Sequence, residues 1–208
     1  MRPPISTAPP KNESPLTDCG MIIPVDSGAA TMRRFKFDFD KGLEAILYVA
    51  NRVAAPNFHK ISKVLYFADL EHLERFGRFI TGDRYIAMEY GPVPSDVNNI
   101  LRCARGEPQY IDLKEEIKSA IEVPGRYTVK PLRPARTTVF SKSDLECLDD
   151  SITKYGPLSF GELVDKSHDA AWQATDEGQE MQLVAIIRMM NHADEILELL
   201  EITDERAA

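Results

Sequence analysis

The runs KVLYFAD at residues 63–69 and ITGDRYIAMEYGPVP at residues 80–94 hold the densest concentration of conformationally specific residues in the chain. The first run lies within a stretch, about 58–76, whose apolar surface is too wide for a helix with one side in water. Asn57 suits the N-cap of this helix, and Gly77 suits the left-handed residue that ends it. We therefore expect a buried central helix with these apolar residues on its surface: Ile61, Val64, Leu65, Phe67, Ala68 and Leu73.

The second run predicts a turn followed by a short extended segment. Residues 81–83, with the sequence TGD, have the composition of a turn, and the apolar and aromatic residues 85–90 favour a strand. Pro92 and Pro94 are expected to limit sheet pairing, because proline has no N–H to donate to a neighbouring strand. A helix near 95–105 is expected to follow them.

Further helices are predicted from capping residues and from the spacing of apolar positions. An early helix is expected to begin at Asp40 and to stop before Pro56. A last helix, about 181–201, would direct Val184, Ile187, Ile196, Leu197 and Leu200 inward. Three more helices, near 113–121, 142–155 and 159–166, each start at a capping pair: Asp112 with Glu115, Ser141 with Asp144, and Ser159 with Glu162.

Residues 127–129 and 137–140 are predicted to form two short paired strands. The fold class that follows is mainly α: a compact multi-helix domain with a short accessory β-hairpin. We expect residues 32–208 to form this domain and the proline-rich residues 1–31 to form a disordered tail.

Composition argues against nucleic acid as a partner. The formal net charge is −8, whereas affinity for nucleic acid depends mainly on Lys and Arg that neutralise phosphates. The one basic cluster, Arg126, Lys130, Arg133 and Arg136, is interpreted as a solvated loop.

Three cysteines, Cys19, Cys103 and Cys147, are too widely spaced for a zinc site or a disulfide framework. Their pattern fits reduced thiols in a cytoplasm. No apolar run approaches the roughly 20 residues that span a bilayer, so we expect no membrane partner. We also expect no cofactor.

Two places could support chemistry. Asp69 and His72 are three residues apart and share a helix face, and Asp83 is expected nearby. These groups could bind a metal or act in acid–base catalysis, although a satisfied polar pair on a partly buried helix explains them as well. His168 and Asp169 stand close to Trp172, where the histidine is interpreted as a hydrogen-bonding residue at a loop or helix end.

The same residues carry a resemblance to a known family. The first block consists of KVLYFAD (63–69), EHL (71–73), RFGR (75–78), ITGDRYIAM (80–88) and YGPVPS (90–95). The second block consists of residues 145–156, LS (158–159), EL (162–163) and SHDAAW (167–172). Together they closely resemble the Panacea domain of the SocA-like antitoxins. This family also includes phage-associated proteins. The resemblance covers about residues 40–175, and it is specific because two separated blocks occur in the correct order.

The resemblance implies a mostly helical antitoxin of a type II toxin–antitoxin system. It implies that the protein neutralises a toxin encoded nearby by direct protein–protein binding, in some members as an adaptor that delivers the toxin to a cellular protease. It implies no catalytic residues. The motif positions, which either maintain the structure or contact the toxin, are Lys63, Tyr66, Asp69, His72, Thr81, Gly82, Asp83, Arg84, Tyr85, Tyr90, Gly91, Pro92, Pro94, His168 and Trp172.

Two other functions remain open from the sequence. One is a small metal-dependent hydrolase that uses Asp69, His72 and Asp83. The other is a DNA-binding protein that represses its own operon, although this function needs a basic recognition helix and none is evident.

Overall fold

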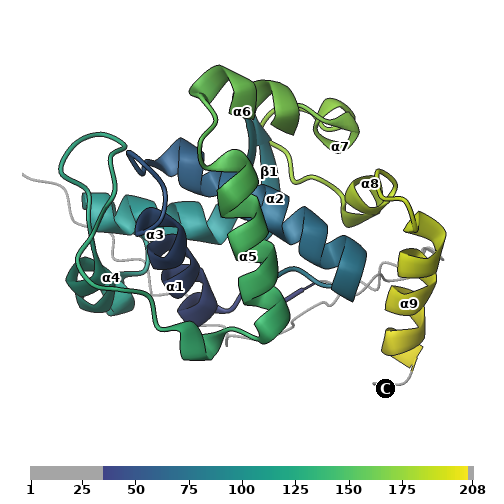
Figure 1. Ribbon diagram of the computed structural model, residues 1–208, viewed down its shortest axis with the longest axis horizontal. Helices are drawn as coiled ribbons and strands as arrows, with labels where there is room; N and C mark the ends of the chain where they lie inside the picture. Colours follow the sequence, from purple (N-terminus) through teal and green to yellow (C-terminus); the bar gives the residue numbers. More distant parts are fainter. Residues whose placement is uncertain (1–34, 206–208) are drawn as a thin grey trace, which may run out of the picture. The chain divides into compact units, whose positions relative to one another are not determined.

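The computed structural model describes residues 35–205, with side chains described as far as residue 200. Its architecture is mainly α, as the sequence predicts (Figure 1). The expected tail, residues 1–31, lies outside the described residues. The helices are α1 (Phe39–Ala50), α2 (Phe58–Phe76), α3 (Ser95–Arg105), α4 (Lys114–Ala120), α5 (Lys142–Tyr155), α6 (Phe160–Ser167), α7 (Ala170–Gln173), α8 (Leu183–Ile187) and α9 (Ala193–Glu205). The strands are β1 (Tyr85–Met88), β2 (Gly91–Pro94), β3 (Ile121–Glu122) and β4 (Lys130–Pro131).

Helix α2 is the central element, with the bounds and caps that its sequence predicts. The Asn57 side chain accepts a hydrogen bond from the Lys60 amide, and Gly77 ends the helix at φ 70°. Helix α2 packs most extensively against α5, and it also contacts α1, α3, α6, α8 and β2 (Figure 1). Most of this helix is enclosed on all sides, and only its last turn, with Arg75 and Phe76, is exposed. This explains why its apolar residues do not follow a single stripe.

The core consists of two clusters, and α2 contributes to both. Ile61 and Leu65 join the first cluster, with apolar residues of α1, α3, α4 and α5. Tyr66 and Leu73 join the second cluster, with residues of β1 and of α6 to α9. The first half of α2 is thus buried mainly by the elements around α1, and its second half mainly by the C-terminal elements.

The β-hairpin lies at β1 and β2, and its second strand contains both prolines. Tyr85 pairs with Pro94 and Ala87 pairs with Pro92, so the expectation that the prolines limit sheet pairing was wrong. The Ser95 amide donates to the Arg84 carbonyl at 2.9 Å, which means that alternate residues of β2 direct their nitrogens toward β1. The two prolines occupy the other positions, where an N–H would face away from β1.

Residues 127–129 and 137–140 do not pair with each other. The Tyr127 carbonyl accepts from the Phe58 amide, and the Val129 amide donates to the Pro56 carbonyl. The backbone of residues 127–129 is therefore hydrogen-bonded to the start of α2. Residues 137–139 form a 3-10 turn instead of a strand. The second ladder joins β3 to β4, and neither expected strand contributes to it.

Two helix predictions needed correction at their starts. Helix α1 begins at Phe39 because the Asp38 side chain, and not that of Asp40, caps it by accepting from the Lys41 amide at 3.0 Å. Helix α4 begins without a side-chain cap after a 3-10 turn, so the predicted pair of Asp112 and Glu115 does not form a capping box. The capping boxes at Ser141 and Ser159 are confirmed.

The expected helix 181–201 is divided into α8 and α9. Glu74 of α2 accepts hydrogen bonds from the Asn191 backbone at 3.2 Å and from its side chain at 2.7 Å, which stabilises a turn between the two helices. Ile187 and Ile196 are buried as predicted, whereas Val184 is 40% exposed. Within residues 35–205, no helix is both long and apolar enough to cross a membrane.

Candidate functional site

The two blocks of motif residues meet around Lys63. Its ammonium group donates to the Pro92 carbonyl at 2.8 Å, and its side chain is almost completely buried. Gly91 has φ +93°, and a Cβ there would lie 2.7 Å from Lys63 Nζ and also too close to Ser167 Oγ. Burial lowers the pKa of Lys63 to about 7, and the Asp169 carboxylate opposes this shift. Lys63 therefore joins α2, the hairpin and α6 at one point, and this point requires glycine at position 91.

Asp169 extends this junction to α7. One carboxylate oxygen accepts from the Tyr66 hydroxyl at 2.6 Å, and the other accepts from the Trp172 amide at 3.0 Å and caps α7. Burial and the Asp169 charge raise the pKa of Tyr66. The Trp172 indole donates to the Met88 carbonyl at 3.0 Å and stacks on His168 with ring centroids 3.6 Å apart. Trp172 thus fixes the end of the hairpin on α7. The Nε2 of His168 is buried without a hydrogen-bond partner among the described residues, contrary to the expectation that this side chain hydrogen-bonds at a loop or helix end.

Asp69 joins α2 to the segment that precedes the hairpin. Its carboxylate accepts from the Ile80 amide at 2.7 Å and from the Tyr85 hydroxyl at 2.6 Å. Burial raises the pKa of Asp69 to about 6 against these two hydrogen bonds. Both oxygens of Asp69 are therefore used inside the fold.

Asp83 caps helix α3 from outside that helix. It accepts from the Arg84, Asp96 and Val97 amides at 2.8, 3.0 and 2.8 Å. Pro94, the residue that immediately precedes α3, offers no side-chain cap. Burial raises the pKa of Asp83 to about 7, while the amide donors oppose the shift.

The neighbouring residues of the turn have local roles. Gly82 has φ +71°, and a Cβ there would collide with the Lys36 backbone. The Thr81 hydroxyl accepts from the Asp83 amide at 3.3 Å. Arg84 is exposed and lies 3.6 Å from a carboxylate oxygen of Glu180, a weak surface pair.

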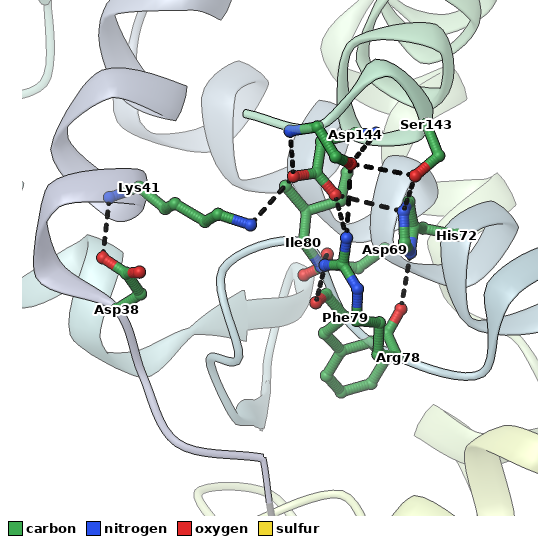
Figure 2. A network of polar contacts seen from close by, with 10 residues as sticks. Asp38, Lys41, Asp69, His72, Arg78, Phe79, Ile80, Ser143 and Asp144 are labelled. Carbon is green, nitrogen blue, oxygen red and sulfur yellow. Dashed lines mark hydrogen bonds and ion pairs between the residues drawn. The ribbon is translucent and has the colours of Figure 1, made fainter. Parts of the chain in front are cut away.

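His72 belongs to a different network, which joins α1, α2 and α5 (Figure 2). Its Nδ1 faces the Arg78 carbonyl at 2.8 Å, and its Nε2 faces Ser143 Oγ and Asp144 Oδ1, both at 3.1 Å. Asp144 is fully buried and also accepts from Lys41 at 2.8 Å and from Arg78 at 2.7 Å. Burial alone would raise the pKa of Asp144, but the hydrogen bonds from His72, Lys41, the Ser141 amide and Arg78 lower it below its ordinary value.

The structure does not bring Asp69, His72 and Asp83 together as a catalytic group. Asp69 faces Tyr85, His72 faces Asp144, and Asp83 faces the first turn of α3. Among the residues that the structure describes, no group of three or more His, Cys, Asp or Glu side chains could hold a metal ion. Each of the three residues thus has a structural role in the fold.

Sequence reasoning missed two buried carboxylates as network centres. Asp144 was predicted only as a helix cap, and Glu44 was not singled out. Glu44 is fully buried and accepts from both Arg133 Nη atoms, at 2.9 and 2.8 Å, and from the Arg136 amide and Nε, at 2.7 and 2.8 Å. Arg133 and Arg136 therefore do not belong to a merely solvated loop. The sequence signal that could have identified Glu44 was its position on the inward face of α1, where apolar residues are expected.

One group of motif-region side chains is not used inside the fold. Tyr90, in the turn of the hairpin, is 50% exposed, and Met88 beside it is 42% exposed. Phe160 at the start of α6 is 54% exposed, and its ring lies 5.4 Å from that of Tyr90. Exposed apolar side chains therefore lie on the hairpin turn and on α6, next to the junction around Lys63.

Comparison with known proteins identifies the family of the chain. The model of the family described as Antitoxin SocA-like, Panacea domain, matches residues 61–173, which is more than half of the chain. The match begins inside α2 and ends at the last residue of α7, so α1, α8 and α9 lie outside it. No curated protein and no solved structure matches the chain. The matched span includes Lys63, Asp83, Gly91 and Trp172, whose contacts with the hairpin and its neighbours are described above. The chain therefore belongs to the SocA-like antitoxin family with a Panacea domain.

Proposed function

We propose that this protein is the antitoxin of a type II toxin–antitoxin pair and neutralises a toxin encoded beside it by direct protein–protein contact. The observation that carries the proposal is the family match over residues 61–173, the same residues that form the hairpin junction. A binding protein needs a rigid frame and an accessible surface, and it needs no convergent catalytic groups. The toxin and its antitoxin would meet in the cytoplasm.

The hydrolase alternative has little support in the geometry. A hydrolase that used Asp69, His72 and Asp83 would need these groups to converge on one substrate. Instead, Asp69 accepts from Tyr85 in β1, His72 pairs with Ser143 in α5, and Asp83 accepts from the Asp96 amide in α3. A DNA-binding function is likewise weakly supported, because Arg133 and Arg136 are bound to Glu44. Neutralisation of a protein therefore explains the arrangement best.

The test is co-expression with the open reading frame adjacent to the gene. Expression of that neighbour alone should arrest growth, and co-expression of this chain should restore it. Two purified proteins that form a stable complex would support direct inhibition. A toxin half-life that falls when this chain is present, in cells with an intact protease and not in a protease-deficient strain, would support delivery to a protease. Growth arrest that co-expression leaves unchanged would refute the proposal.

A further inference from the structure

Exposed apolar and acidic side chains lie on the segments that meet at the hairpin junction, and we term this group of residues the acidic–aromatic surface. It comprises Met88, Glu89 and Tyr90 in the hairpin turn, Phe160 on α6, and the turn residues Asp176 and Glu177. Three contacts place these segments together: the Tyr90 and Phe160 rings lie 5.4 Å apart, the Trp172 indole donates to the Met88 carbonyl at 3.0 Å, and the Gly178 amide donates to the Ala87 carbonyl at 2.6 Å. Figure 1 shows β1, α6 and α7 near one another in the upper part of the view.

The apolar part of this surface has the composition of a binding site. Large apolar side chains that are about half exposed and adjacent to one another are unusual on a monomer, and they often mark contact with another protein. Tyr, Phe and Met are also enriched in protein interfaces. Phe160 is supported from below by the His59 ring, with centroids 4.2 Å apart. The aromatic side chains are therefore held in position before any partner arrives.

Hydrogen bonds hold both strands of the hairpin beneath this surface. Lys63 holds β2 through the Pro92 carbonyl, and Trp172 holds the end of β1 through the Met88 carbonyl. The other edge of β1 is occupied, because its Ala87 amide donates to the Gln179 carbonyl at 2.9 Å. On the outer edge of β2, Pro92 and Pro94 have no N–H to donate. A partner would therefore bind through side chains and not by adding a strand, and little conformational entropy would be lost at the hairpin on binding.

The edge of the surface is acidic. Glu89, Asp176 and Glu177 are exposed and form no ion pair with any described residue. On α6, the exposed Asp165 and Lys166 have opposite charges and offset each other. Carboxylates around apolar side chains attract a cationic partner during encounter, while the apolar centre stabilises the complex once it has formed.

We propose that the acidic–aromatic surface binds a basic segment of the toxin, with apolar side chains of that segment on Tyr90 and Phe160 and its Lys or Arg residues facing Glu89, Asp176 and Glu177. The proposal rests on the antitoxin function proposed above and specifies the surface that performs it. The occupant is a basic protein segment, since an acidic segment would face three carboxylates that have no cationic partner among the described residues.

The experiment measures binding of the purified full-length chain to the protein encoded by the adjacent open reading frame. Tyr90→Ala and Phe160→Ala remove the apolar centre, and Glu177→Lys reverses a charge at the edge. Ile111→Ala is the matched control, because Ile111 is 70% exposed and lies outside the surface. Melting temperatures of all variants show whether each remains folded, and Glu177→Lys removes no packing contact.

The expected result is at least a tenfold increase in Kd for Tyr90→Ala and Phe160→Ala, with an unchanged Kd for Ile111→Ala. Glu177→Lys should slow association severalfold at low salt and much less at high salt. If the wild-type chain binds and neutralises the neighbouring protein and the folded variants bind it with the same affinity, the proposed binding surface is wrong and the antitoxin function stands. If the wild-type chain does not bind the neighbour, both proposals are overturned. If Tyr90→Ala abolishes self-association and leaves toxin binding intact, the surface joins two copies of this chain, and the proposal is wrong.

Discussion

Replacement of Asp144 by Asn should destabilise the protein strongly, although the two side chains have nearly the same shape. Asp144 is fully buried and balances the charges of Lys41, at 2.8 Å, and Arg78, at 2.7 Å. Removing one partner of a buried ion pair costs about 3–5 kcal/mol. Lys41 and Arg78 are 19% and 37% exposed, so water can partly solvate them in the variant, and we expect a loss near the lower limit, about 3 kcal/mol.

Urea and thermal unfolding would measure this loss. For a domain of this size, about 3 kcal/mol corresponds to a fall in Tm of roughly 6–12 °C. Glu146→Gln is the control on the same helix, because Glu146 is 48% exposed and its surface pair with Arg75 should contribute little to stability. A loss of less than about 1 kcal/mol for Asp144→Asn would show that the network in Figure 2 does not hold α1, α2 and α5 together.

The loss should also depend on pH. The folded-state pKa of Asp144 lies below its ordinary value of 3.8, so the carboxylate stabilises the fold above that value. This contribution is lost as the pH falls below 3.8 toward the folded-state pKa. The stability difference between wild type and variant should therefore be constant from about pH 5 to pH 8 and should narrow in acid. A difference that grows in acid would contradict this account.

Three other substitutions test the frame. In urea unfolding, Gly91→Ala should destabilise the protein more than Gly106→Ala. An alanine at either position would have a positive φ, which costs about 1–3 kcal/mol, but only the methyl group at position 91 would also press on Lys63. Equal losses would contradict the close contact. Asp83→Ala should cost about 2 kcal/mol and speed hydrogen exchange of the Val97 amide, and unchanged exchange would rule out the cap. Wild-type stability should rise between about pH 7 and pH 10, because burial lowers the folded-state pKa of Lys63 from 10.5 to about 7; Lys63→Met should lack this rise, and a variant that keeps it would show that another group titrates.

Local sequence signals predicted the helices that are capped by their own residues. Asn57 and Gly77 marked both ends of α2, and the capping boxes at Ser141 and Ser159 marked α5 and α6. These interactions join residues a few positions apart, so the sequence contains all the information that they need. The mainly α class and the central position of α2 followed from them.

Contacts between distant residues explain what local signals could not predict. Helix α3 is capped by Asp83 across the hairpin, and the turn between α8 and α9 is held by Glu74 of α2. The backbone of residues 127–129 pairs with the start of α2, which no local pattern indicates. The motif positions Lys63 and Trp172 were identified from the family resemblance, but only the fold shows that both hold the hairpin.

Glu44 has a consequence for how this protein can change during evolution. The segment 122–140 is exposed along much of its length, yet Arg133 and Arg136 attach it to the carboxylate of Glu44, which lies 89 and 92 positions earlier in the chain. A transplant of this segment from a relative without those arginines would leave the carboxylate of Glu44 without a cation inside α1. Diversification of the loop is therefore coupled to helix α1, and recombination within this family should exchange position 44 together with the loop or retain both arginines.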